Sequence, residues 1–128
     1  LDLLKSGQTT TDFPSALSSI FNLDLQPFMS NWMQYNPKDL IKELEIPVLI
    51  INGTKDLQVA VTEAQQLKEA KEEALLEIIE NMNHLLFEIN GDDLVNSKSY
   101  NDNSYAVMPK VIEIMTVFIK KEKSTTKK

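Results

Sequence analysis

The sequence predicts an α/β fold built around a parallel sheet. Residues 47–51 form a short, continuous apolar run with the length and composition of a buried strand, and residues 75–79, which are apolar except for Glu77, are predicted to be a second strand. Residues 62–71, which lie between them, have the apolar spacing of an amphipathic helix. A strand, a helix and a second strand in this order form a crossover unit, which places the two strands side by side and parallel.

The segment before the first strand is predicted to be mostly helical. We expect a loop over residues 1–12, which are polar and show no periodicity. Apolar residues at helical spacing then predict two short helices within residues 13–35. Asn36 followed by Pro37 is typical of a helix start, so a further helix is expected to run through Leu44.

The remaining elements follow from local patterns. Thr62 and Gln65 have the spacing of a capping box at the start of the crossover helix. Residues 90–106 are polar and predict a long loop, and Pro109 then starts a helix with one apolar stripe. We expect residues 121–128, which are rich in lysine, to form a frayed tail. The stripe consists of Val111, Ile112, Met115, Phe118 and Ile119.

The charge of the chain disfavours some classes of partner. The net charge of −6 argues against binding to nucleic acid. All 13 basic residues are lysines, so no arginine is present to bind a phosphate or carboxylate through two parallel hydrogen bonds. The only histidine and the absence of cysteine leave no constellation typical of a metal site, and we expect neither a metal nor a cofactor.

The sequence does not determine the cellular compartment of the protein. A chain without cysteine fits the cytoplasm and a secreted or periplasmic location equally well. No apolar run approaches the roughly 20 residues that a membrane helix needs. Because Leu1 is not an initiator methionine, we expect the chain to be processed or truncated.

Two residues of catalytic type follow the two predicted strands. Asp56 lies in the loop after the first strand, and His84 lies in the loop after the second. The carboxyl ends of parallel strands meet at one edge of a sheet, and adjacent strands are about 4.8 Å apart. We therefore expect this carboxylate and this imidazole to meet at hydrogen-bond distance, although either residue taken alone is as compatible with a turn or core position.

The residues around this pair resemble a known family. The segment IPVLIINGTKDLQV at residues 46–59, together with ENMNH at residues 80–84, closely resembles the last third of serine hydrolases of the α/β-hydrolase family. The resemblance implies that Asp56 is the acid and His84 the base of a catalytic triad. It also implies that residues 1–44 are the end of a helical lid and its connection, and that residues 45–120 are the carboxyl-terminal part of the hydrolase core.

The chain departs from this family at the nucleophile. The family's serine stands in a G-x-S-x-G turn after an earlier strand, and no glycine of this chain frames a serine. The resemblance therefore implies a nucleophile and oxyanion hole upstream, and an inactive chain without them. The expected activity is hydrolysis of a small ester, thioester or amide, and the expected partner is the missing amino-terminal half or a second copy. The alternative is a non-catalytic binding domain derived from such an enzyme.

Two apolar side chains of the lid segment are candidates for substrate contact. Trp32 and Met29 belong to a stripe of aromatic and methionine residues that suits an irregular apolar ligand. The alternative is that they are core positions of the helices. Core positions are the favoured interpretation for any single residue of the stripe, and Trp32 and Met29 are the best candidates for contact with a substrate.

Overall fold

The structure is a computed structural model that describes residues 2–125, with side chains described as far as Lys121. The chain divides into two compact units, residues 1–40 and 41–128. The division falls within α4 (Pro37–Lys42), whereas the sequence predicted a boundary after Leu44. The Asn36 side chain caps this helix as expected, because its Oδ1 accepts a 3.1 Å hydrogen bond from the Lys38 amide.

The first unit is helical. It contains α1 (Asp2–Lys5), a 3-10 turn (Ser15–Leu17), α2 (Ser18–Phe21) and α3 (Gln26–Trp32). The two short helices predicted within residues 13–35 are therefore present, but the loop expected over residues 1–12 is wrong where α1 forms. The reason is tertiary, since α1 packs on α3 and its Leu4 side chain is buried.

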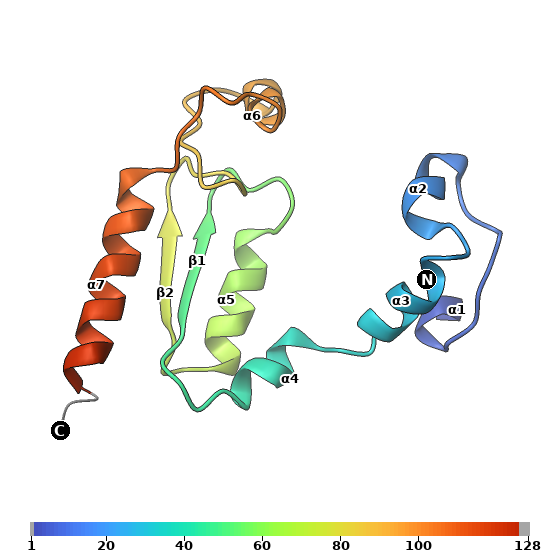
Figure 1. The fold of residues 1–128 in the computed structure, drawn as a ribbon, viewed down its shortest axis with the longest axis horizontal. Helices are drawn as coiled ribbons and strands as arrows, with labels where there is room; N and C mark the ends of the chain where they lie inside the picture. The colour runs from blue at the N-terminus through green and yellow to red at the C-terminus, as the bar shows by residue number, and fades with distance from the viewer. Residues whose placement is uncertain (1, 126–128) are drawn as a thin grey trace. The chain divides into compact units, whose positions relative to one another are not determined.

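The second unit contains the predicted crossover. Strand β1 (Leu49–Gly53) is followed by α5 (Val61–Ala70) and then by β2 (Leu75–Ile79). The strands are parallel, with Leu49 opposite Leu75 and Gly53 opposite Ile79. This arrangement confirms the α/β class, and Figure 1 shows α5 and α7 (Pro109–Thr125) on opposite sides of the two strands.

Each face of the sheet packs against one helix. Ile50 packs with Ala64 of α5 in one apolar cluster, and Ile79 packs with Val111 of α7 in another. The covering is incomplete, because the Leu75 side chain at the start of β2 is 44% exposed. In β2, exposed and half-buried residues alternate up to the buried Ile79, so one face of this strand is more open than the other.

Helix α6 (Asp93–Ser99) replaces part of the loop that the sequence predicted over residues 90–106. Its start is capped by Asp92, whose Oδ1 accepts a 3.0 Å hydrogen bond from the Val95 amide. Two of its polar side chains, Asn96 and Ser99, are buried. The polar composition of residues 90–106 therefore predicted a loop, whereas the structure has a helix there with two polar side chains buried.

Three further expectations need correction. Helix α5 begins at Val61 after Ala60 and no side chain caps it, so the capping box at Thr62 is wrong. Helix α7 continues through residues 121–125 of the expected frayed tail, because lysine and glutamate are good helix formers; residues 126–128 lie outside the described residues. On α7, Val111 is buried but Ile112 is 57% exposed, so the predicted stripe is wider than the face that packs.

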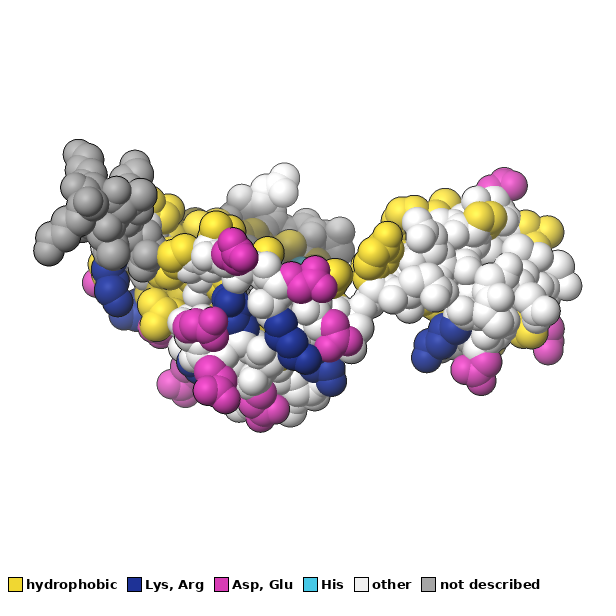
Figure 2. Space-filling model, turned by 90° about the horizontal axis from the view of Figure 1, so that it is seen from below, with side chains coloured by type: hydrophobic (Ala, Val, Ile, Leu, Met, Phe, Trp, Pro, Cys, Tyr) yellow, Lys and Arg dark blue, Asp and Glu magenta, His cyan; other side chains and the backbone are white. Residues whose placement is uncertain are grey.

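The surface carries both charges. On the face shown in Figure 2, lysine and acidic side chains of the second unit are interspersed rather than gathered into a basic patch. None of the helices that the structure describes is long and apolar enough to cross a membrane.

Candidate functional site

Asp56 and His84 lie at the same edge of the sheet. Asp56 follows β1 by three residues in the loop after Gly53, and His84 lies in the turn after β2. Because the strands are parallel and in register, both loops leave the sheet at its carboxyl edge. The position expected from the sequence for both residues is therefore confirmed.

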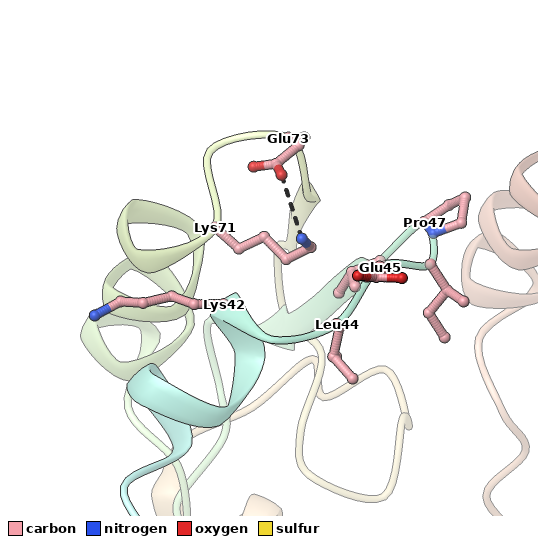
Figure 3. A pocket seen from close by; sticks show the side chains of 8 residues that line it. Lys42, Leu44, Glu45, Pro47, Lys71 and Glu73 are labelled. Atoms are coloured by element: carbon pink, nitrogen blue, oxygen red, sulfur yellow. Dashed lines mark hydrogen bonds and ion pairs between the residues drawn. The ribbon is translucent and has the colours of Figure 1, made fainter.

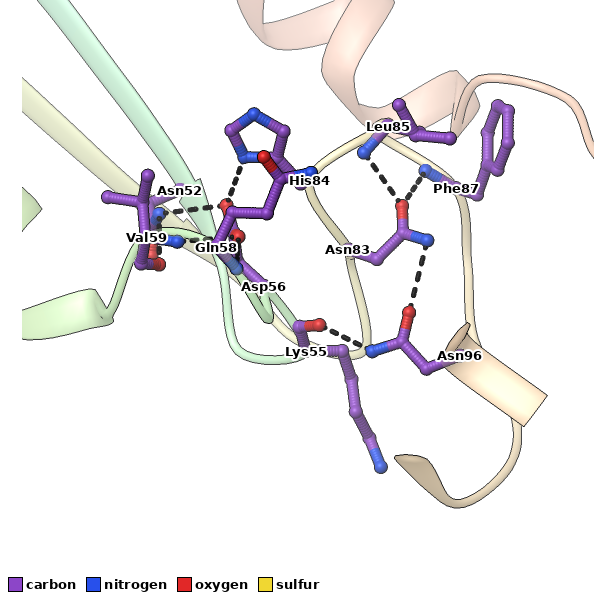
Figure 4. Close-up of polar contacts among 10 residues, drawn as sticks. All are labelled: Asn52, Lys55, Asp56, Gln58, Val59, Asn83, His84, Leu85, Phe87 and Asn96. Carbon is purple, nitrogen blue, oxygen red and sulfur yellow. Dashed lines mark hydrogen bonds and ion pairs between the residues drawn. The ribbon is translucent and has the colours of Figure 1, made fainter. Parts of the chain in front are cut away.

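The two side chains contact each other. His84 Nδ1 lies 2.9 Å from Asp56 Oδ2, which is hydrogen-bond distance (Figure 4). The Asp56 side chain is only 6% exposed, whereas that of His84 is 39% exposed. The carboxylate is thus held inside the loop, and the imidazole forms the exposed end of the pair.

The second oxygen of Asp56 is held by the backbone of its own loop. Asp56 Oδ1 accepts hydrogen bonds of 2.8 Å from the Gln58 amide and 2.9 Å from the Val59 amide. Burial raises the pKa of this carboxyl, but the hydrogen bonds from Val59, His84 and Gln58 and the charge of His84 together lower the pKa below its ordinary value. Asp56 is therefore a carboxylate at neutral pH, and its direction is fixed by its own loop.

The contact with Asp56 determines the direction of the imidazole. In Figure 4 the Nε2 atom of His84 points away from the carboxylate. A carboxylate can only accept a hydrogen bond, so Nδ1 carries the proton and neutral His84 has its lone pair on Nε2. Within the described part of the chain, no serine or threonine hydroxyl donates a hydrogen bond to this nitrogen. His84 can therefore accept a proton at Nε2 from a group that is not among its hydrogen-bond partners described above.

The two loops are joined directly at the sheet edge. The Thr54 amide donates a 3.0 Å hydrogen bond to the Ile79 carbonyl, and the Lys55 amide donates a 2.9 Å bond to the Met82 carbonyl. Gly53 permits this approach, because a Cβ atom at this position would collide with the Met82 carbonyl. The loop of the acid is therefore packed backbone to backbone against the loop of the base.

Sequence reasoning missed the asparagine side chains that surround the pair. Asn83 and Asn96 are both fully buried and hydrogen bond to each other, with 3.2 Å between Asn83 Nδ2 and Asn96 Oδ1. Asn83 stands directly before His84 in the recognised motif, but its burial could not be inferred because Asn is usually exposed. Asn52, at the end of β1, lies 3.5 Å from Asp56 Oδ2 and was also missed.

Trp32 and Met29 lie on α3 in the first unit, away in sequence from the pair. Trp32 is 63% exposed and stacks on Phe28 with ring centroids 6.1 Å apart, whereas Met29 is half-buried. The exposure of Trp32 does not fit the alternative prediction that this residue is a core position. Substrate contact by Trp32 and Met29 stays a prediction.

A cavity lies at the opposite edge of the sheet, away from Asp56 and His84. It has a volume of about 480 Å³ and is lined by residues that precede the two strands, including Pro47 and Glu73 (Figure 3). The buried Lys71 ammonium in its wall lies 3.3 Å from Glu73 Oε1. Among the described residues, no three acidic or histidine side chains gather closely enough to hold a metal ion.

The chain was also compared with known proteins. No family model matches it, and no curated protein matches it.

Proposed function

We propose that this chain is the carboxyl-terminal part of a serine hydrolase with the α/β-hydrolase fold. The observation that carries the proposal is the 2.9 Å contact between Asp56 and His84 at the carboxyl edge of a parallel sheet, with Nε2 directed away from the carboxylate. The substrate class is a small ester, thioester or amide. The order of the acid before the base along the chain supports the same family.

In this proposal, His84 transfers protons in each half of the reaction and Asp56 stabilises its charged form. A serine hydroxyl from outside this sequence attacks the substrate carbonyl while His84 Nε2 accepts its proton, and a serine–carbonyl bond forms. His84 then returns the proton to the leaving group as the acyl bond breaks. Water later repeats the sequence to release the acid and regenerate the serine. Asp56 stabilises the imidazolium throughout and keeps the proton of neutral His84 on Nδ1.

The unpaired surface of the second unit supports a larger assembly. In the described part of the chain, the sheet has two strands, so each strand has one unpaired edge. Ile112, Met115 and Ile119 form an exposed apolar row on α7. Size-exclusion chromatography of the 128-residue chain is expected to show self-association. A compact monomer would speak against a partner segment or a second copy at these surfaces.

Labelling with a fluorophosphonate tests the catalytic role. The complete gene product that carries this sequence is expected to react covalently at its serine, and His84→Ala is expected to abolish the labelling. Gln58→Ala is the matched control, because the Gln58 backbone amide and not its side chain holds Asp56. Labelling of His84→Ala at the normal rate would overturn the assignment of the base. A complete product that does not label at all would favour the non-catalytic binding domain.

A further inference from the structure

We infer that the segment from Gly91 to Ser99, which includes α6, is a strut that holds the acid loop and the base loop in contact, with Asn96 as its positioning residue. The inference deepens the proposed function, since it rests on Asp56 and His84 being the functional pair. Asn96 touches neither of these side chains. It acts through the residues that directly precede them, Lys55 and Asn83.

The strut is bonded to the acid loop at two points. Asn96 Nδ2 donates a 2.6 Å hydrogen bond to the backbone carbonyl of Lys55, the residue before Asp56. Lys55 Nζ in turn donates a 2.9 Å hydrogen bond to the Gly91 carbonyl, just before α6. The peptide that leads into Asp56 is therefore fixed from the side away from His84.

The same strut is bonded to the base loop. Asn83 Nδ2 donates to Asn96 Oδ1 at 3.2 Å and to Ser99 Oγ at 2.9 Å. Asn83 Oδ1 accepts 3.0 Å hydrogen bonds from the amides of Leu85 and Phe87, which closes the turn around His84. The Asn83 side chain thus uses both of its donors and both acceptor sites, and the turn cannot rotate without breaking them.

The side chains of this hydrogen-bond network are buried, and their burial fixes the relative position of the two loops. Asn83 and Asn96 are 0% exposed and Ser99 is 1% exposed, so water cannot replace a lost partner. A fully satisfied buried network is rigid and specifies one arrangement. Two hydrogen bonds in series, from Asn96 to the Lys55 carbonyl and from Asn83 to Asn96, therefore set the separation of the two loops. This separation in turn sets the contact of Asp56 Oδ2 with His84 Nδ1.

The single histidine of the chain provides a direct test. In protein labelled with ¹⁵N-histidine, the two ring nitrogens of His84 give one pair of NMR signals, which report whether Nδ1 or Nε2 carries the proton. The wild-type chain is expected to hold the proton on Nδ1. Asn96→Asp keeps the acceptor for Asn83 but removes the donor to Lys55, and is expected to lose most of the Nδ1-protonated form. A variant that is less stable but still folded at the temperature of the measurement keeps this signature as long as the contact with Asp56 persists.

Two further variants keep the test decisive. Lys55→Met removes the hydrogen bond to Gly91 from a half-buried side chain, and is expected to shift the same signals partway. Ser97→Ala, on the exposed side of α6, is the matched control and is expected to leave them unchanged. Wild-type signals in both Asn96→Asp and Lys55→Met would overturn the strut. If Asp56→Asn changes the signals in that case, the pair stands without the strut; if it does not, the pair itself fails.

Discussion

Asp56 Oδ2 lies 2.9 Å from His84 Nδ1, and the amides of Gln58 and Val59 hold the other oxygen of the same carboxylate. The carboxylate is therefore held at Oδ1 by its own loop, and at Oδ2 by His84 and, at 3.5 Å, by Asn52 Nδ2. Its direction is set by β1 and the following turn, whereas the imidazole depends on β2 and its turn. Because the two side chains come from different loops, a change in the spacing of the loops is expected to change the hydrogen bond to Nδ1 and with it the tautomer of His84.

We predict that Asp56→Asn reduces the rate of fluorophosphonate labelling of the complete gene product by about 10⁴-fold, because an amide in place of the carboxylate favours the wrong tautomer of His84. Asp102→Asn is the matched control. Asp102 accepts a hydrogen bond from the Ser104 amide and makes no recorded contact with His84. Equal rates for the two variants would contradict a catalytic role for Asp56.

The lowered pKa of Asp56 predicts a loss of stability in acid. Its pKa in the folded chain lies below the ordinary value of 3.8, so the unfolded chain takes up this proton at a higher pH than the folded chain. The contribution of Asp56 is therefore complete above pH 3.8 and is lost as the pH falls through the folded pKa. Urea unfolding at a series of pH values should show a steeper acid dependence for the wild-type chain than for Asp56→Asn. Parallel curves would refute the prediction.

We expect Gly53→Ala to destabilise the second unit by about 3 kcal/mol, because the new Cβ atom meets a backbone carbonyl that cannot move without opening the sheet edge. Gly91→Ala is the comparison. Its Cβ atom meets the Val95 side chain, which is partly exposed and can adjust. Chemical denaturation should therefore rank Gly53→Ala as the more damaging change, and the reverse order would show that the loops do not pack as described.

Two valines on α7 lie on different faces of the helix, one packed and one exposed. Val111 is 1% exposed and Val117 is 61% exposed. Val111→Ala is expected to lower the free energy of unfolding by about 2 kcal/mol through the cavity it leaves, whereas Val117→Ala should change it by less than about 0.5 kcal/mol. Thermal or urea unfolding measures both. A large cost at Val117 would mean that another surface covers this face.

Local sequence patterns determined the crossover unit and the position of the candidate pair. The segments before Asp56 and His84 are strands because their short length and branched side chains suit a parallel sheet, and parallel strands bring their carboxyl ends together. Pro37 and the side-chain cap from Asn36 marked a helix start through interactions that act within a few residues. The parallel topology and the family resemblance together predicted that Asp56 and His84 meet, and their side chains lie 2.9 Å apart.

Only the tertiary structure decided which polar residues turn inward. Residues 90–106 carry the composition of a loop, yet α6 forms there because Asn96 and Ser99 find buried partners in the loops after the two strands. Likewise, Ile112 and Val111 are equally apolar in the sequence, but α7 turns only Val111 toward Ile79 and Met82. Periodicity and composition describe each segment by itself, whereas burial and hydrogen-bond partners depend on residues far away along the chain.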